Sequence, residues 1–146
     1  GVFKIEREGK GALAYVDGAY NDKNGLAGYG VSLICDGVPM AFSGSVVRYA
    51  NESKNLVGEL EAALIAAKQA LELDCTRLVI VYDCESIETL ATGKSTPKSR
   101  LSKYYVHEMN EYMKQLDITF SYSKAHSGNE WHNFADRLAK QGCGLK

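Results

Sequence analysis

The chain has 146 residues, the length of one ordinary domain that can bury a core without disulfide or metal staples. Its 45% hydrophobic and 24% charged residues exclude a disordered or fibrous chain, and no apolar run approaches the length of a membrane span. The formal net charge of −1 by itself opposes a nucleic-acid partner, because binding to phosphates depends on clustered lysine and arginine.

The ends and the cysteines bound the organisation of the chain. Residues 1–11 are rich in charged side chains, so we expect a linker or a trimmed end, then one domain over 12–142 and a tail at 143–146. The four cysteines form neither a CxxC pair nor a zinc spacing. We therefore expect free thiols that act as small buried hydrophobic side chains, in a cytoplasmic protein.

Three segments typical of β-strands open the domain. Ala12–Tyr20, Ala27–Cys35 and Val38–Val47 are short and largely apolar. Asp36–Gly37, between the second and the third, is a strong hairpin signal. These segments predict an antiparallel meander.

The period of the sequence then changes. Apolar residues recur every three or four positions over Asn55–Leu73, which predicts a helix with one buried face. Arg77–Tyr82 is a continuous apolar run, typical of a strand buried on both faces. A short helix is expected at Ser86–Thr92, ended by Gly93.

The last third predicts a helix, a strand and a helix. Thr96–Pro97 offers a capping hydroxyl and then a proline, which favours the start of a long helix there. Ile118–Tyr122 alternates as a half-exposed strand does, and a final helix is expected around Trp131–Gln141. The order β-β-β-α-β-α-α-β-α predicts an α/β fold with a mixed five-stranded sheet, in which an antiparallel meander continues into parallel strands.

Four acids stand among apolar neighbours. Asp17 interrupts the first strand, Glu59 lies near the start of an aliphatic helix, Asp83 closes a buried strand and Asp136 lies within the last helix. Each alone has a plain structural interpretation, as a turn former, a helix-dipole partner or a solvated side chain. Together they need a compensating cation, and an all-oxygen ligand set favours Mg²⁺ or Mn²⁺ over zinc.

Four segments resemble the signature blocks of type 1 ribonucleases H, in the order and spacing of that family. The resemblance spans most of the chain and implies a ribonuclease H-like sheet with helices on both faces. It also implies a monomeric nuclease that cuts the RNA strand of RNA–DNA hybrids and leaves 5′-phosphate and 3′-hydroxyl ends. The four segments are YVDGAYN (Tyr15–Asn21), GELEAALIAAKQAL (Gly58–Leu71), VIVYDCESI (Val79–Ile87) and KAHSGNEWHNFADRLAK (Lys124–Lys140).

The resemblance assigns roles to these acids. Asp17 would be the carboxylate shared by two Mg²⁺ ions, with Mn²⁺ as a substitute. Glu59 and Asp83 would hold one ion with it, and Asp136 would complete the other. His126 matches the family histidine that assists proton transfer or product release; its plain alternative is a surface histidine.

The other histidines, His107 and His132, have no such sequence context and are not predicted as site residues. The wording YDCESIETLATGK is similar to a bacterial subgroup whose longer members carry an N-terminal hybrid-binding domain. Such a domain would make residues 1–11 the remnant of a linker.

The resemblance also implies where the substrate is recognised. The backbone of Gly18, Ala19 and Tyr20, expected as a turn, would read the 2′-hydroxyl that distinguishes RNA from DNA, together with Glu59. Asn55 would reach the minor groove, or equally would be a helix N-cap.

Ser95 and Thr96, after Lys94, resemble a pocket for a phosphate of the DNA strand, with a loop that ends in a helix cap as the alternative. The basic, tryptophan-rich insertion of the best-known bacterial members is missing here. Gly93–Lys103 offers four cations in its place, so tight independent binding is not expected.

Two other classes are weighed against this prediction. Integrases and transposases share the expected fold but place a glutamate last among the catalytic acids, whereas here Glu59 is second and Asp136 is last. Inactive ribonuclease H-like domains that serve as binding modules lose one or more acids, whereas this chain retains all four.

Overall fold

The computed structural model describes residues 10–124 and 130–145, without the side chains of residues 51 and 52. The observed order of elements agrees with the order predicted from the sequence. The elements are β1 (Gly11–Asn21), β2 (Leu26–Cys35), β3 (Val38–Val46), α2 (Ala50–Glu72), β4 (Arg77–Tyr82), α3 (Ser86–Ala91), α4 (Arg100–Met113), β5 (Asp117–Tyr122) and α5 (Glu130–Gly142).

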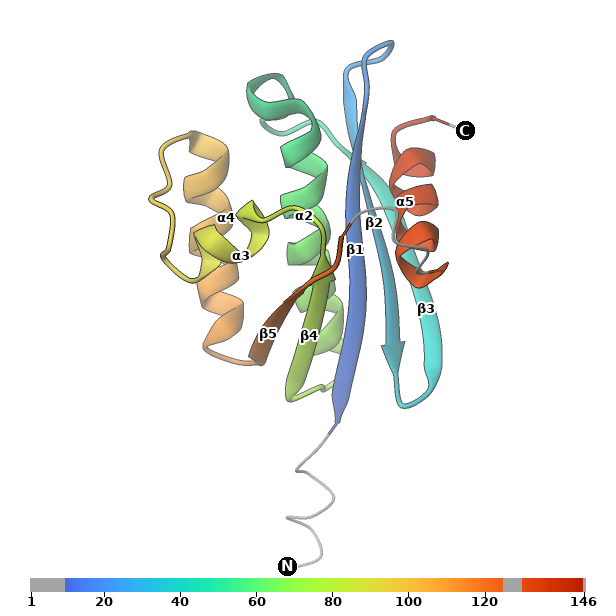
Figure 1. Ribbon diagram of the computed structural model, residues 1–146, viewed down its shortest axis with the longest axis vertical. Coiled ribbons are helices and arrows are strands. Elements are labelled where there is room, and N and C mark those ends of the chain that lie inside the picture. Colours follow the sequence, from blue (N-terminus) through green and yellow to red (C-terminus); the bar gives the residue numbers. More distant parts are fainter. Residues whose placement is uncertain (1–9, 125–129, 146) are drawn as a thin grey trace, which may run out of the picture.

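The five strands form one mixed sheet in the order β3-β2-β1-β4-β5 (Figure 1). β1 pairs with β2 and β2 with β3 in antiparallel fashion, as the Asp36–Gly37 hairpin predicted. β1 pairs with β4 and β4 with β5 in parallel. The predicted sheet, a meander followed by parallel strands, is confirmed.

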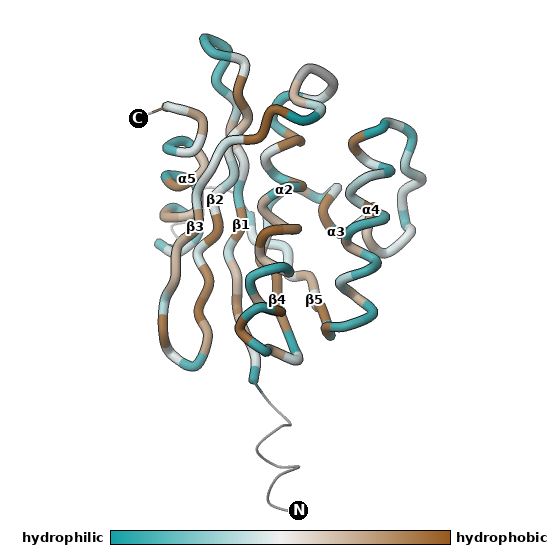
Figure 2. The backbone as a smooth tube through the Cα atoms, turned by 180° about the vertical axis from the view of Figure 1, so that it is seen from behind, coloured by the Kyte–Doolittle hydropathy of each residue, from teal (hydrophilic) through white to brown (hydrophobic). Residues whose placement is uncertain are grey.

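Helices cover both faces of this sheet, as predicted. α2 packs on one face, with α4 beside it, and α5 packs on the other face over β1, β2 and β3 (Figure 1). The apolar positions visible in Figure 2 are concentrated on the strands and on α2. The buried face of α2 consists largely of alanine, which lets the helix axis come close to the sheet; these residues are Ala62, Ala63, Ala66, Ala67 and Ala70.

Glycines bring three backbones into contact at one point of the sheet. A Cβ on Gly28 of β2 would lie 2.1 Å from the carbonyl oxygen of Ala139 in α5. A Cβ on Gly58 of α2 would lie 2.1 Å from the carbonyl oxygen of Gly28. Only glycine leaves room for these approaches, so α2, β2 and α5 are stacked without intervening side chains.

Polar contacts fix α5 at its far end. The side-chain amides of Asn21 and Asn24 donate to the carbonyl oxygen of Cys143, at 2.9 and 3.0 Å. The hydroxyl of Ser43 in β3 donates to the carbonyl oxygen of Leu138, at 2.6 Å. These bonds satisfy carbonyl groups at the C-terminal end of the helix and hold it against the meander.

Two helix starts differ from the prediction. α4 begins at Arg100 and not at Thr96–Pro97, because Ser99 and Ser102 form a capping box with backbone-to-hydroxyl distances of 3.0 and 2.9 Å. Two reciprocal hydrogen bonds satisfy more of the helix end than one hydroxyl does. α2 begins at Ala50, ahead of the predicted Asn55, and is kinked where Ser53 and Lys54 leave helical geometry.

The four cysteines are free thiols; three are buried and Cys84 is half-buried. This agrees with their interpretation as small hydrophobic side chains. None of the helices within the described ranges is long and apolar enough to cross a membrane.

Candidate active site

Two of the predicted acids meet where β1 and β4 diverge. The parallel register pairs Tyr15 with Val81, so Asp17 and Asp83 each lie two residues beyond this pair and share its face. Asp17 is 7% exposed, and the backbone N–H of Gly18 donates to its Oδ1 at 2.9 Å. The end of a buried strand pair therefore presents two carboxylates at one place.

Glu59 reaches the same place from α2, past a glycine. A Cβ on Gly18 would lie 2.2 Å from the backbone nitrogen of Glu59, so the helix approaches β1 only because residue 18 has no side chain. Glu59 is 9% exposed and its side chain is hydrogen-bonded to Asp17. Its Oε2 is buried and has no hydrogen-bond partner among the described residues.

Burial and mutual repulsion change how these acids ionise. The pKa of Asp17 is raised to about 6: burial is the largest cause, the nearby charges of Asp83 and Asp136 add to it, and hydrogen bonds from Glu59 and Gly18 oppose it. Burial and the charge of Asp17 raise the pKa of Glu59 well above its ordinary value. The hydrogen bond between the two lowers the pKa of Asp17 and raises that of Glu59, so Glu59 holds the proton they share.

α5 contributes two further side chains from one face. Asp136 is half-buried, and its Oδ2 lies 3.1 Å from Nζ of Lys140, one turn further on. His132 is one turn before Asp136, is 6% exposed, and places Nε2 3.5 Å from Oδ2 of Asp83. Asp17, Asp83 and His132 each offer a ligand atom within 4.8 Å of the others.

His132 was missed by the sequence prediction. Its spacing of four residues from Asp136 puts both side chains on one helical face, and this was the available signal. The signal was too weak to use, because many helices carry a histidine four residues from an acid without any site.

This donor set suits a divalent cation. It combines acids that repel one another with a buried carboxylate oxygen that has no partner in the described part of the chain. Such an oxygen is destabilising unless something positive satisfies it. Carboxylates are the ligands that Mg²⁺ and Mn²⁺ prefer.

The proposed recognition residues Gly18, Ala19 and Tyr20 lie inside β1 and do not form a turn. The prediction of a turn was wrong, because β1 continues to Asn21 in register with β2. β4 pairs only with Gly11–Tyr15, so beyond Tyr15 the opposite edge of β1 has no strand partner among the described residues. The side chain of Ala19 is buried under α5, whereas Tyr20 is half-buried.

The other recognition residues are placed as follows. Asn55 is exposed just after the kink in α2, and it is not the N-cap, which is Tyr49. Ser95 is half-buried, with its N–H donating to the carbonyl oxygen of Thr89 at 2.9 Å, and Thr96 is exposed in the loop before α4. His126 lies outside the described residues.

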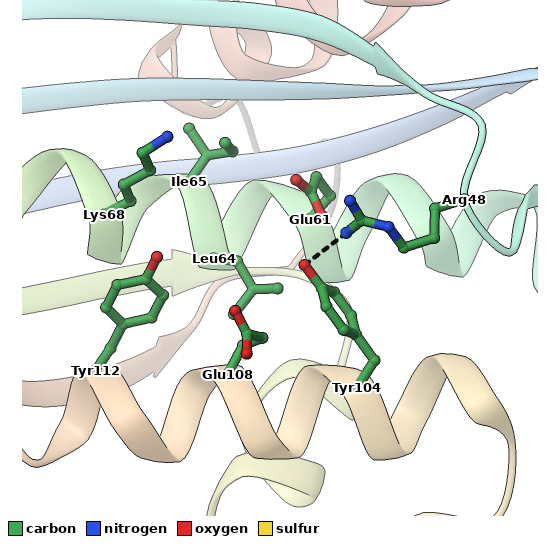
Figure 3. A pocket seen from close by; sticks show the side chains of 8 residues that line it. All are labelled: Arg48, Glu61, Leu64, Ile65, Lys68, Tyr104, Glu108 and Tyr112. Carbon is green, nitrogen blue, oxygen red and sulfur yellow. Dashed lines mark hydrogen bonds between the residues drawn. The ribbon is translucent and has the colours of Figure 1, made fainter.

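A cavity of about 250 Å³ lies elsewhere, between α2 and α4 (Figure 3). Arg48 and Tyr104 both line it, and the guanidinium of Arg48 donates to the hydroxyl of Tyr104 at 2.6 Å (Figure 3). Burial raises the pKa of Glu61 in its wall, against the nearby cations Arg48 and Lys68. None of the predicted site residues lines this cavity, so the acidic cluster and not the cavity is the candidate active site.

The chain matches the family model of RNase H over residues 9–144. It is 29% identical over 140 residues to the ribonuclease H of Francisella philomiragia subsp. philomiragia, covering 88% of each chain. The ribonuclease H of Francisella tularensis subsp. novicida matches with the same identity and coverage.

Solved structures show the same fold. The N-terminal RNase H domain of a Mycobacterium tuberculosis protein superposes with a TM-score of 0.78 at 16% identity, covering 92% of this chain and 94% of the other. RNase H1 from the halophilic archaeon Halobacterium salinarum NRC-1 gives 0.76 at 19% identity, covering 92% and 98%. LC11-RNase H1, solved in complex with an RNA/DNA hybrid, gives 0.73 at 19% identity, covering 91% and 96%.

Proposed function

The chain belongs to the RNase H family and is a ribonuclease H, and on that premise we propose that it hydrolyses the RNA strand of RNA–DNA hybrids with two bound divalent cations. The observation that carries the proposal is the buried pair Asp17 and Glu59 beside Asp83. Both members of the pair have raised pKa values, so they hold a proton where a cation would otherwise be bound.

Each acid would have a distinct place in the metal site. Asp17, Glu59 and Asp83 would hold one cation, and Asp17 with Asp136 would hold the other. The bound cations supply activation of the attacking water and neutralisation of the leaving 3′ oxygen. The products would be a 5′-phosphate and a 3′-hydroxyl.

The chain's own groups prepare this site. The N–H of Gly18 fixes Oδ1 of Asp17, so one oxygen of that carboxylate keeps its orientation. Glu59 must release the proton that it shares with Asp17 before both act as ligands. Asp136 must leave its ion pair with Lys140 to bind a cation, and its side chain is exposed enough to move. His126 would assist proton transfer or product release.

Recognition of RNA is proposed at the edge of β1. Beyond Tyr15 no described strand pairs with the β4 side of β1, so backbone groups of Gly18–Tyr20 that point to that side would bond a 2′-hydroxyl, which both donates and accepts. Asn55 is exposed near the same end of α2 and would contact the minor groove. Ser95 and Thr96 would contact a phosphate of the DNA strand.

The test is cleavage of end-labelled RNA in a hybrid, with Mg²⁺ or Mn²⁺. We expect cleavage of the hybrid, little cleavage of single-stranded RNA or duplex DNA, and none with EDTA. Asp17→Asn should abolish cleavage, whereas Asp36→Asn, at an exposed hairpin position, should not. Equal cleavage of duplex DNA, or activity that survives EDTA, would refute the proposal.

Four expectations stay predictions. They are Mg²⁺ as the ion used in the cell, a monomeric state, a cytoplasmic location, and a hybrid-binding domain N-terminal to this one in a longer protein. Light scattering of the purified chain tests the second of these directly.

A further inference from the structure

His132 lies inside the acidic cluster. Its ring packs in the protein, 6% exposed, with the ring of Tyr15 in tilted contact at 6.4 Å between centroids. Its Nε2 faces Oδ2 of Asp83 at 3.5 Å, and its ligand atom lies within 4.8 Å of those of Asp17 and Asp83. Three ligand atoms from β1, from the end of β4 and from α5 therefore lie close together.

The separation of His132 and Asp83 suits two ligands of one cation. A charge-assisted hydrogen bond between nitrogen and oxygen is shorter, about 2.7–2.9 Å. Two ligand atoms that each lie about 2.1 Å from the same ion are roughly 3.0–3.5 Å apart. The observed 3.5 Å falls at the upper end of that range.

We infer that His132 is a nitrogen ligand in the metal site, and that it makes this site prefer transition-metal cations such as Mn²⁺ or Co²⁺ over Mg²⁺ more strongly than carboxylates alone would. The inference rests on the proposed function in one respect, namely that the acidic cluster is a metal site. Imidazole is a good ligand for first-row transition metals, whereas Mg²⁺ takes mainly carboxylate, phosphate and water oxygens.

The competing explanation is that His132 only orients Asp83 through a hydrogen bond. Such a positioning histidine would affect the binding of all divalent cations alike, because it acts through the same carboxylate. A ligand histidine would affect transition metals selectively. The two explanations therefore differ in the ratio of metal affinities and in whether nitrogen is bonded to the ion.

The experiment is pulsed electron paramagnetic resonance of Mn²⁺ bound to the whole chain without nucleic acid. We expect modulation from a directly coordinated nitrogen in the wild type, which changes when histidine is labelled with ¹⁵N. His132→Gln should lose it, because glutamine keeps a polar group near the position of Nε2 but has no imidazole. The control His107→Gln, in α4 with its side chain 74% exposed, should keep it. His126→Gln should also keep it.

Calorimetric titration with Co²⁺, Mn²⁺ and Mg²⁺ gives the second readout. His132→Gln should weaken binding of Co²⁺ about tenfold, and that of Mg²⁺ by roughly threefold or less. Circular dichroism checks that the variant is folded, and His132→Asn replaces it if it is not. The ¹⁵N-histidine experiment on the wild type does not depend on the folding of any variant.

Several outcomes would overturn the inference. They are the absence of nitrogen modulation with Mn²⁺ bound, modulation that persists in His132→Gln or disappears in His126→Gln, and equal loss of Mg²⁺ and Co²⁺ affinity. Cleavage of the hybrid with Mg²⁺ is measured on the same samples. Cleavage without nitrogen modulation would refute the role of His132 as a ligand and leave the proposed function intact. Nitrogen modulation without cleavage would support that role and refute the proposed function.

Discussion

The carboxylates of Asp17, Glu59 and Asp83 share a small, mostly buried volume. Two like charges 4 Å apart repel by roughly 4 kcal/mol at an effective dielectric of about 20, and less at an open site. Without metal the fold carries this repulsion, partly relieved by the proton on Glu59.

Asp83→Asn removes one of these charges and keeps the shape of the side chain. We expect this variant to be inactive and yet to melt at a higher temperature than the wild type in EDTA. The gain in the free energy of unfolding should be on the order of 1 kcal/mol. Added Mg²⁺ should narrow the gap, because it relieves the same repulsion in the wild type. Differential scanning calorimetry measures this, with Asp36→Asn as the exposed control. A lower melting temperature in EDTA would mean that Asp83 is a structural cap.

The raised pKa of Asp17 predicts how metal-free stability depends on pH. Because the pKa in the folded state, about 6, exceeds the ordinary 3.8, the native state binds more protons than the unfolded state between these values. Protonated Asp17 therefore does not destabilise the fold at low pH. The free energy of unfolding falls as pH rises from about 4 through about 6, and then levels off.

Urea unfolding in EDTA at pH 5 and pH 7.5 measures this effect. Between pH 5 and pH 7.5 the wild type should lose about 1–1.5 kcal/mol of stability, roughly half of the loss that the whole pKa shift represents. Asp17→Asn should show a smaller dependence on pH, and Mg²⁺ should reduce it in the wild type. Identical pH profiles for wild type and Asp17→Asn would contradict the raised pKa.

At the scale of elements, the site depends on the contact between α2 and β1 at Gly18. In Gly18→Ala the new Cβ would meet backbone atoms of Glu59, which cannot rotate away. We expect a destabilisation of about 1–3 kcal/mol and a large loss of activity, because Glu59 is displaced. Gly11→Ala, in the same strand but facing only the flexible side chain of Arg77 at 3.4 Å, is the matched control. Chemical denaturation and hybrid cleavage are the measurements, and equal effects of both substitutions would count against the contact.

The sequence predicted the elements well because hydrophobic period and turn chemistry are local. The hairpin at Asp36–Gly37 and the helix after Asn55 follow from such signals. The predicted start of α4 was wrong because two possible capping residues, Thr96 and Ser99, lie three positions apart. Only the structure shows which hydroxyl caps the helix.

The site could be predicted only in part, for a different reason. The acids stood out among apolar neighbours and a family resemblance assigned their roles; the register of β1 against β4 then explains why Asp17 and Asp83 meet. His132 was missed because the acids beside it, Asp83 and Asp17, are 49 residues or more away in sequence, and the local spacing from Asp136 is too common to identify a site. The packing role of Gly18 was missed for the same reason.

At the scale of the whole molecule, charge limits binding. The net charge is −1, and the cations Lys94, Lys98, Arg100 and Lys103 are all exposed around the loop before α4. We expect weak binding to hybrid, with a steep dependence on salt, since each phosphate contact adds about 0.9 to the slope of log affinity against log salt.

Fluorescence anisotropy with labelled hybrid at increasing salt, in Ca²⁺ to prevent cleavage, tests this prediction. Lys98→Gln should lower the magnitude of the slope by about 0.9, the value expected for the loss of one phosphate contact. Fusion of a hybrid-binding domain at the N-terminus should tighten binding by raising the effective concentration. Tight binding that does not change with salt would refute it.

The stacking of α2, β2 and α5 at Gly28 has a consequence for how this protein can change over evolutionary time. The helices that carry Glu59 and Asp136 are held apart by the thickness of one peptide backbone, and that thickness does not depend on which side chains surround it. Sequence drift in the cores on either side of the sheet can therefore proceed without altering the spacing of the acids. A mutation at Gly28 or Gly58 would change that spacing at once, even though neither residue carries a chemical group that the reaction uses.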